Sequence, residues 1–422
     1  MSDREFEFEI VVVGAGPAGL AAASAAAECG RRVALVEGTP WLGGQIWRGQ
    51  PPNFSSPQAR RWFEKFRRSG AALLDRTSVI ASPGRGRLLG EHPAGPREIR
   101  WEKLILAPGA RELFLPFPGW TLPGVIGVGG LQTLVKNGWP VAGKKIVVAG
   151  TGPLLLAAAD GLKRHGSEII SIAEQAPFSR VASFGLKLLA HPRKVFQGFG
   201  LRLRLAGVPY RFGVWPVQAD GVDQVRSVTL TDGRKKWTEE CDVLACGFNL
   251  TPNVELPLAL GCELSGGFVG VNQWQETSAK GIYCAGEPTG IGGADCALTE
   301  GRIAGYAAGG EASKAAAWFN QRASWHRFRA ALSETFRLRC ELKSLAPDNV
   351  LLCRCEDVTL GRVKSFGGWR EAKLQTRCGM GACQGRVCGA AANVIIGWGL
   401  ESVRPPVLPA RVQSLISTTD ES

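Results

Sequence analysis

The sequence predicts an α/β protein in which two Rossmann-like dinucleotide-binding domains precede a small helical domain at the C-terminus. Three observations lead to this fold class. A strand, a glycine-rich turn, a helix and a second strand follow one another in residues 8–37, and the same order returns in residues 144–174. Five cysteines then crowd into residues 353–388. The length agrees, because 422 residues correspond to about three domains.

Composition and charge narrow the class further. Hydrophobic residues make up 45% and charged residues 21%, as in ordinary globular chains. No apolar run reaches the roughly 18–20 residues of a membrane span. The first ten residues alternate charged and apolar side chains, unlike a secretion signal. We therefore expect a cytoplasmic protein without a transmembrane segment, either free or peripheral at the inner face of the membrane.

The net charge of +13, from 50 Lys and Arg against 37 Asp and Glu, suits three kinds of partner. These are an acidic protein, an anionic cofactor and an anionic membrane surface. Nucleic acid is not expected as a partner, because no DNA- or RNA-binding motif accompanies the charge.

The first glycine-rich turn has the features of an adenine-nucleotide site. It follows a β-branched apolar run at residues 10–13, which is typical of a buried strand. The candidate binding residues are Gly14, Gly16, Pro17, Ala18, Gly19 and, after the second strand, Glu37. Gly14 permits a tight turn, Gly16 lets a pyrophosphate approach the backbone, and Gly19 lets the helix pack on the strand. Glu37 is placed to accept from ribose hydroxyls. The alternative is a turn that only packs.

Three later segments, at residues 41–45, 104–112 and 281–287, resemble the flavin-binding stretches of the glutathione- and thioredoxin-reductase superfamily. The resemblance covers about residues 8–310. It implies a glutathione-reductase-like fold with FAD in the N-terminal site. The further cofactor-binding residues that it implies are Gly44, Gln45, Gly109, Arg111, Gly286 and Glu287. Some relatives carry another adenine nucleotide there, such as NAD or ATP, so these remain alternatives.

The second glycine-rich turn departs from the motif at one position. Gly150 and Gly152 are present, but Leu155 replaces the third glycine, and the following strand ends at Glu174. Because that glycine serves helix–strand packing, its loss is expected to push the helix away from the strand. We expect a retained fold without coenzyme. The alternative is a NAD(P)H site, with NADH favoured because no arginines suited to a 2′-phosphate follow Glu174.

The sequence lacks the paired cysteines of disulfide reductases. Residues 46–53 hold no cysteine, and in the second domain only Cys241 and Cys246 occur, flanking a predicted strand at residues 242–245. We interpret both, and the other isolated cysteines, as small buried side chains. None of the four histidines accompanies a serine or cysteine motif. The catalytic residues, if this chain has any, are therefore unknown.

The cysteines near the C-terminus follow a metal-binding pattern. Cys353-x-Cys355 is followed, after 22 residues, by Cys378-x4-Cys383. Zinc sites usually contain C-x2-C turns, whereas four thiolates from two loops suit a 2Fe–2S cluster. Glycines 379, 381 and 385 are expected to turn backbone N–H groups towards the sulfurs, and arginines 354, 377 and 386 to add positive charge. Zinc and simple packing are the alternatives.

This segment resembles the 2Fe–2S domain related to bacterioferritin-associated ferredoxin. Its C-R-C-E and T-R-C-G-M-G-A-C-Q-G-R-V-C-G motifs are similar to those of the α subunits of heteromeric amino-acid and opine dehydrogenases, the group of opine oxidases, D-hydroxyproline dehydrogenase and hydrogen cyanide synthase. The ligands that this resemblance implies are Cys353, Cys355, Cys378 and Cys383. Cys388 would be a spare cysteine, buried in the helix that follows.

The resemblance also implies a function. A separate β subunit, an amino-acid-oxidase-like flavoprotein, would oxidise an amine to an imine, and a small third subunit occurs in some such complexes. Electrons would pass through an FMN at the subunit boundary to the 2Fe–2S cluster and on to an acceptor such as a quinone. Two other functions remain open: a stand-alone NAD(P)H-dependent flavin oxidoreductase, and a non-catalytic scaffold stabilised by a nucleotide.

The predicted domain organisation follows from these motifs. A split flavin-type domain takes residues 1–116 and 248–310, and the second dinucleotide-type domain takes residues 117–247. A helical connector is expected at 311–345, the cluster domain at 346–402, and an extended, proline-containing tail at 403–422.

Overall fold

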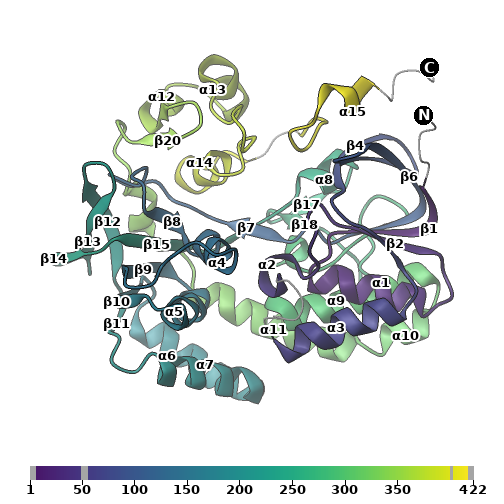
Figure 1. The fold of residues 1–422 in the computed structure, drawn as a ribbon, viewed down its shortest axis with the longest axis horizontal. Helices are drawn as coiled ribbons and strands as arrows, with labels where there is room; N and C mark the ends of the chain where they lie inside the picture. Colours follow the sequence, from purple (N-terminus) through teal and green to yellow (C-terminus); the bar gives the residue numbers. More distant parts are fainter. Residues whose placement is uncertain (1–5, 49–55, 400–402, 417–422) are drawn as a thin grey trace. The chain divides into compact units, whose positions relative to one another are not determined.

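The computed structural model describes residues 6–48, 56–399 and 403–416. Contacts divide the chain into two compact units (Figure 1). Unit 1 consists of Met1–Arg111, Pro252–Arg329 and Ser402–Ser422, and unit 2 of Glu112–Thr251 and Ala330–Glu401. Three of the four passages of the chain between the units fall within β7 (Ala110–Glu112), β16 (Leu250–Pro252) and α11 (Phe319–Thr335).

Unit 1 is built on a seven-stranded sheet with the order β3-β2-β1-β6-β5-β4, in which β19 also pairs with β6. The central strand pairs are parallel, so that Val12 lies beside Leu35 on one side and Ile105 on the other, while β4, β5 and β6 are antiparallel. The strands are β1 (Phe6–Val13), β2 (Val33–Val36), β3 (Ala72–Leu74), β4 (Ser78–Gly84), β5 (Arg87–His92), β6 (Gly95–Leu106) and β19 (Ile282–Cys284), with a separate pair, β17 (Leu264–Ser265) and β18 (Phe268–Val269).

Two helices of unit 1, α1 and α9, pack together through small residues. A β-carbon added at Gly301 would lie 2.2 Å from the carbonyl oxygen of Ala18, and one added at Gly305 would lie 2.3 Å from that of Ala22. This close contact fixes α1 against the middle and the second half of α9. The helices of this unit are α1 (Pro17–Ala27), α2 (Gly44–Trp47), α3 (Pro57–Arg68), α8 (Glu255–Ala259), α9 (Gly293–Gly309), α10 (Ala312–Ala316) and α15 (Val412–Ile416).

Unit 2 contains a second, five-stranded parallel sheet with the order β11-β10-β9-β15-β8. Its strands are β8 (Val125–Gly127), β9 (Lys145–Thr151), β10 (Glu168–Glu174), β11 (Tyr210–Phe212) and β15 (Val243–Phe248). The helices with it are α4 (Val128–Lys136), α5 (Leu154–Arg164), α6 (Phe178–Lys187), the short η1 (Leu188–Ala190) and α7 (Pro192–Arg204). An antiparallel sheet of β12 (Trp215–Gly221), β13 (Val225–Thr231) and β14 (Lys236–Glu240) completes it.

A small, mainly helical module forms the C-terminal part of unit 2. It consists of η3 (Cys340–Ser344), β20 (Leu351–Cys353), β21 (Val358–Thr359), α12 (Leu360–Lys364), α13 (Trp369–Thr376) and α14 (Cys388–Ile396). Its own core contains Leu352, Val363 and Ala372. The indole N–H of Trp120 donates to the carbonyl of Leu351 at 2.8 Å and ties the module to the rest of unit 2. The predicted α/β fold with two Rossmann-like sheets and a C-terminal region is confirmed.

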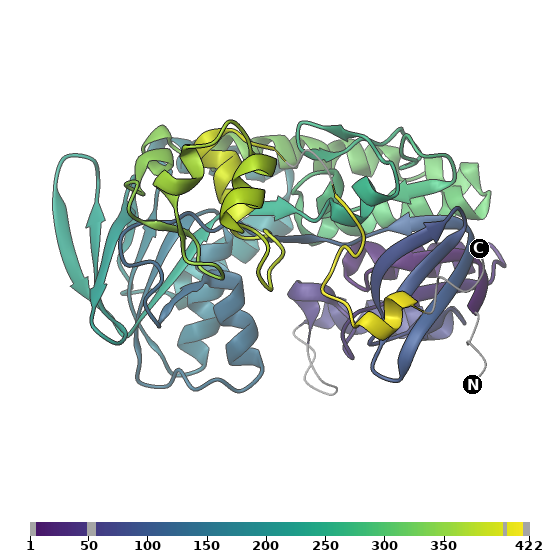
Figure 2. The same cartoon turned by 90° about the horizontal axis from the view of Figure 1, so that it is seen from above.

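The expectation of an extended tail is wrong for its central part. Residues 412–416 form α15, and the tail packs on the antiparallel edge of the unit 1 sheet (Figure 2). The N–H of Val407 donates to Ile80 at 2.7 Å, and Arg411 forms a 3.0 Å ion pair with Glu91. Residues 417–422 lie outside the described part of the chain.

Two further expectations need adjustment. Of the isolated cysteines interpreted as buried, Cys340 is exposed and Cys29 is half-buried, whereas Cys241 and Cys246 are buried as expected. Cys246 lies within β15 rather than beyond its end. Among the described residues, we find no helix that combines the length and apolar character of a membrane span. The division of the chain into five parts, one of them split, stays a prediction.

Candidate functional site

The first glycine-rich turn has the geometry that its motif requires. Gly14 has a φ of +101°, and a β-carbon there would lie 2.3 Å from the carbonyl oxygen of Ala107. A β-carbon at Gly19 would lie 1.7 Å from the carbonyl oxygen of Gly14. At Gly16, in contrast, the nearest atom is 4.0 Å away, so the backbone there is open to a ligand. Gly16 caps α1 without a side-chain bond, which leaves the first N–H groups of the helix for an anion.

Segments far apart in the sequence meet at this turn. The N–H of Gly43 donates to Ala15 at 2.8 Å, and a β-carbon at Gly44 would lie 3.0 Å from the α-carbon of Gly16. Gly286, with a φ of +85°, packs so closely that its β-carbon would lie 2.9 Å from that of Ala18. The loop before α2, the start of α1 and the turn after β19 therefore form one site. Gln45 lies on the exposed side of α2.

Glu37 is bound to the turn but keeps acceptor capacity. One carboxylate oxygen accepts from the N–H of Ala15 at 2.9 Å, and the other from the N–H and the hydroxyl of Thr39 at 3.0 and 2.9 Å. An ionised carboxylate offers about four acceptor positions, and this one is only half-buried. A ribose hydroxyl can therefore still donate to it.

Glu287 holds a buried oxygen that lacks a partner. Its Oε1 accepts from the N–H of Gly293 at 2.9 Å, while Oε2 is buried without a hydrogen bond to any described residue. Burial raises the pKa of this carboxyl group to about 7. Buried polar atoms are rarely left unpaired, so a ligand hydroxyl suits this position.

Two of the predicted cofactor residues have structural partners instead. Arg111 forms a 2.8 Å ion pair with Glu255 and donates to Asn253 at 2.7 Å. The carbonyl of Gly109 accepts from the N–H of Asn253 at 3.0 Å. Both residues therefore hold the segment before α8 in place. A direct contact with a cofactor stays a prediction for each.

A buried hydrogen-bond network beneath the turn after β19 was not predicted from the sequence. Glu300 on α9 accepts from the N–H of Gly286 and the hydroxyl of Thr289, both at 2.9 Å, and lies 2.8 Å from Nε2 of His326. The sulfur of Cys296 completes a group whose ligand atoms lie within 4.8 Å of one another. However, an Arg329 nitrogen lies 3.4 Å from Glu300, and its positive charge opposes a metal ion.

This network serves to hold the turn rather than to bind a cation. The two hydrogen bonds that Glu300 accepts from Gly286 and Thr289 fix residues 286–289, which carry the unpaired oxygen of Glu287. No sequence signal could have found it, because its members come from a turn, from α9 and from α11 without a shared motif.

The second glycine-rich turn, in unit 2, is closed by its own acid. Glu174 is completely buried and accepts from the N–H of Gly152 at 2.7 Å, the hydroxyl of Thr151 at 2.7 Å and the N–H of Ala176 at 2.8 Å. Burial raises its pKa to about 7. Leu155 is completely buried in the position of the third glycine. The acid that would meet a ribose in a coenzyme site is therefore withdrawn into the protein.

The C-terminal module brings five thiols together. Cys353 ends β20, Cys378 follows α13 and Cys388 begins α14; all three are buried, and their sulfurs lie within 4.8 Å of one another. Cys388 also lies within hydrogen-bonding reach of Cys383, which in turn interacts with Cys355. Cys388 is buried as expected, yet it lies among the predicted ligands. The sequence analysis placed Cys388 in this helix as a spare cysteine; its position among the ligands follows from the packing of α14.

Thiol–thiol hydrogen bonds and backbone N–H groups favour the thiolate form of two of these cysteines, Cys353 and Cys383. The hydrogen bond from Cys388 lowers the pKa of Cys353 to about 5, assisted by the N–H of Gly379. The hydrogen bond from Cys388 likewise lowers the pKa of Cys383 to about 4, assisted by the N–H groups of Val387 and Gly385. The same bonds raise the pKa of Cys388 far above its usual value. Metals bind thiolates, so this arrangement is prepared for a metal centre.

Glycines shape the loop that carries these thiols. A β-carbon at Gly381 would lie 2.3 Å from that of Cys355, and one at Gly379, whose φ is +80°, would lie 2.9 Å from the ring of Trp369. Two of the arginines expected to assist the sulfurs have other partners. Arg377 pairs with Glu356 at 2.8 Å, and Arg354 lies over the ring of Trp120.

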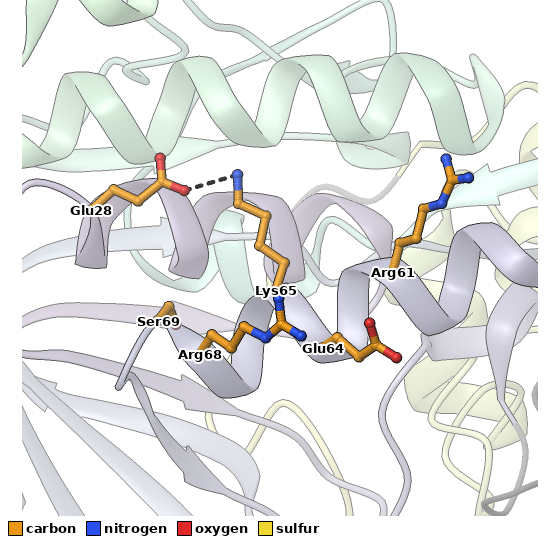
Figure 3. Close-up of a pocket in the computed structure, with 6 residues that line it drawn as sticks. All are labelled: Glu28, Arg61, Glu64, Lys65, Arg68 and Ser69. Atoms are coloured by element: carbon orange, nitrogen blue, oxygen red, sulfur yellow. Dashed lines mark ion pairs between the residues drawn. The ribbon is translucent and has the colours of Figure 1, made fainter.

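A surface hollow on unit 1 has neither an open glycine-rich backbone nor a group of thiols. Figure 3 shows side chains of both charges around it, and the Glu28–Lys65 ion pair at 2.8 Å crosses part of it. Its lining residues are Glu28, Arg61, Glu64, Lys65, Arg68 and Ser69. Because exposed charges of opposite sign alternate around it, we assign no ligand to this hollow.

Comparisons with known proteins agree with this geometry. Residues 8–301 match the family described as pyridine nucleotide-disulphide oxidoreductase. The chain is 31% identical to the HcnB subunit of hydrogen cyanide synthase from Pseudomonas aeruginosa, over 90% of each protein. It is 32% identical to a subunit of opine oxidase from Rhizobium meliloti, over 95% of this chain and 97% of that protein.

Solved structures share the fold. L-proline dehydrogenase from P. horikoshii superposes with a TM-score of 0.68 and 20% identity, over 98% of this chain and 80% of that one. Thioredoxin reductase from T. acidophilum gives 0.53 and 21% identity, over 75% of this chain and 99% of that one.

Proposed function

Because the chain belongs to the pyridine nucleotide-disulphide oxidoreductase family, we propose that it is the electron-transferring subunit of a heteromeric dehydrogenase that contains flavin and an iron–sulfur cluster. The substrate class would be an amino acid, an imino acid or an opine. The names of two relatives, which are subunits of opine oxidase and of hydrogen cyanide synthase, support both the subunit role and this class. The chain is accordingly an oxidoreductase subunit.

The convergence of five thiols in the C-terminal module carries this proposal. Three buried sulfurs lie within 4.8 Å of one another, and the pKa values of Cys353 and Cys383 are lowered towards the thiolate form. This donor set fits a 2Fe–2S cluster, which accepts and releases single electrons. The residues around it would tune that property, because the N–H groups of Gly379 and Gly385 stabilise negative charge on the sulfurs.

The predicted ligands are Cys353, Cys355, Cys378 and Cys383, and the structure adds Cys388 as a fifth candidate. Five single Cys→Ser variants distinguish the ligands from the spare thiol. Four of the variants should lose the cluster, and the one that keeps its absorbance and its acid-labile sulfide identifies the spare. If all five variants keep the cluster, these thiols do not hold it.

We propose FAD as the occupant of the site in unit 1. The open backbone at Gly16, the remaining acceptor capacity of Glu37 and the unpaired oxygen of Glu287 fit a dinucleotide with ribose and ribityl hydroxyls. Acid extraction of the purified chain, followed by chromatography, separates FAD from NAD and ATP, which are the alternatives. Flavin in the extract supports the proposal, and ATP or NAD alone would contradict it.

The partner in this proposal is an amino-acid-oxidase-like flavoprotein β subunit, with or without a small third subunit. FMN at their boundary and a quinone as the final acceptor complete the proposed electron path. The central experiment is electron paramagnetic resonance of the anaerobic chain after dithionite. A 2Fe–2S signal supports the function, while a colourless preparation without acid-labile sulfide would refute it.

A stand-alone NAD(P)H oxidoreductase is the second candidate, favoured by the family description. The burial of Glu174 and Leu155 in the second glycine-rich turn speaks against it. Rapid bleaching of the flavin by NADH in the isolated chain would support this second function. A scaffold role would instead be supported by nucleotide without flavin or cluster.

A further inference from the structure

Helices α6 and α7 of unit 2 expose an unusual number of large apolar side chains. Six of them are between 65% and 75% exposed, which is more than isolated surface leucines explain. They lie on α6, on the short η1 and on α7, which follow one another along one edge of unit 2 (Figure 1). This apolar face consists of Phe178, Leu186, Leu189, Phe196, Phe199 and Leu203.

The inner sides of both helices are already anchored within unit 2. Phe184 on α6 packs edge-on against the ring of Phe336, with the ring centroids 5.4 Å apart. At the end of α7, Leu205 is completely buried, and Arg204 forms a 2.7 Å ion pair with Asp160 on α5. The exposed apolar residues therefore lie on the outer sides of two helices whose inner sides already pack against unit 2.

The apolar residues of α7 form a single stripe. Phe196, Phe199 and Leu203 are spaced by three and four residues, so they share one side of the helix. Arg193 lies roughly a quarter turn to one side of this stripe and Arg202 roughly a quarter turn to the other. Both arginines are exposed, and Arg202 donates to the backbone carbonyls of residues 205 and 208 rather than to a carboxylate.

The charge around this face has one sign. Residues 175–219 contain seven Lys or Arg and no Asp or Glu. Among the described residues, acids from other elements pair with part of this set: Glu334 with Lys187, Asp160 with Arg204 and Glu239 with Arg211. Phenyl and leucyl groups between cations are the pattern of helices that lie in the headgroup region of anionic bilayers.

We propose that the α6–α7 face binds the surface of an anionic lipid bilayer, with the apolar stripe among the acyl chains and the arginines at the phosphate groups. A protein partner fits less well. Protein interfaces also contain Phe and Arg, but they are depleted of Lys and usually pair charges of both signs, whereas residues 175–219 include Lys187 and Lys194 among their seven cations and no acid. A second copy of the chain would bring like charges together. The inference does not depend on the iron–sulfur centre or on the flavin.

Vesicle flotation of the full chain tests this proposal. Vesicles of phosphatidylcholine with phosphatidylglycerol should carry the protein upward, and vesicles of phosphatidylcholine alone should carry much less. The triple variant Phe196→Gln, Phe199→Gln and Leu203→Gln should weaken partitioning at least about tenfold, because it removes the side chains that enter the bilayer. Arg193→Gln and Arg202→Gln should each weaken it roughly fivefold.

Leu374→Gln is the matched control, because Leu374 is a 61% exposed leucine on another helix of unit 2, α13. It should bind vesicles like the unchanged protein. All substituted positions are exposed, and circular dichroism checks that each variant is folded. Two outcomes would overturn the proposal: equal binding to both kinds of vesicle, or no vesicle binding combined with self-association that the triple variant abolishes. The second would assign the face to protein contacts.

Discussion

The two glycine-rich turns have nearly the same sequence motif but differ in the burial of the acidic residue that follows them. In unit 1 the acid after the second strand, Glu37, is half-buried, and the turn before it has an open backbone at Gly16. In unit 2 the corresponding acid, Glu174, is completely buried with three donors from its own loop. A dinucleotide-binding motif therefore predicts the fold, whereas the burial of its acidic residue decides whether a ligand can bind to that residue.

The largest expected effect comes from placing leucine, the residue at the third-glycine position of unit 2, at the same position of unit 1. Gly19→Leu places a β-carbon where only 1.7 Å separates it from the carbonyl oxygen of Gly14. The start of α1 must then move, and with it the small-residue contact between α1 and α9. We expect loss of bound nucleotide and a loss of several kcal/mol in the free energy of unfolding, or no folded protein. Thermal unfolding measures the stability, and extraction measures the nucleotide content. If both the stability and the nucleotide content are retained, the packing argument is wrong.

Shortening the leucine that replaces the third glycine in unit 2 should destabilise that unit without creating a coenzyme site. Leu155→Ala removes a completely buried side chain and should lower the free energy of unfolding by about 2–5 kcal/mol. Urea unfolding measures the loss. The comparison predicts no gain in NADH binding, because Glu174 still fills the turn. A variant that bound NADH would show that the leucine alone, and not the acid, had closed this turn.

The sequence allowed the fold to be predicted because glycine spacing and β-branched strands are local signals. The tight turn at Gly14 and the helix–strand packing at Gly19 were expected from the motif, and the gathering of residues 44 and 286 at the first turn was expected from the family resemblance; all are observed. Which acid stays accessible was not predictable, because Glu37 and Glu174 have equivalent positions. Their burial depends on neighbours that come from elsewhere in the chain.

For the C-terminal module, too, the sequence predicted only part of the site. The group of thiols was expected from spacing, but the place of Cys388 among them depends on how α14 packs, which no spacing rule contains. The exposed face of α6 and α7 was also hidden in the sequence. Phe196 and Phe199 are of a residue type that usually lies in the core, and only the structure shows that their side chains are exposed.

A smaller effect is expected from the pH dependence of unit 2. Folding raises the pKa of Glu174 from 4.5 to about 7, so between these values the folded protein holds a proton that the unfolded chain releases. The free energy of unfolding should therefore fall as the pH rises through this window, by at most roughly 3 kcal/mol.

Glu174→Gln should flatten this decline, as measured by urea unfolding at pH 5, 6, 7 and 8. Glu287 of unit 1 has the same raised pKa, and Glu287→Gln provides the comparison that separates the two contributions. An unchanged slope in the Glu174 variant would mean that this carboxyl group is already ionised near its ordinary pKa.

The smallest expected effect compares the two acids directly. Glu37→Gln keeps a carbonyl acceptor for the N–H of Ala15 but removes the charge and one acceptor oxygen, so nucleotide affinity should fall about tenfold. Glu174→Gln should leave that affinity unchanged, because the acid lies in the other unit and faces its own loop. Equilibrium titration of the nucleotide-free chain with FAD measures both. Equal losses in the two variants would mean that both turns act in nucleotide binding, and unit 2 would then have to be regarded as a second coenzyme site.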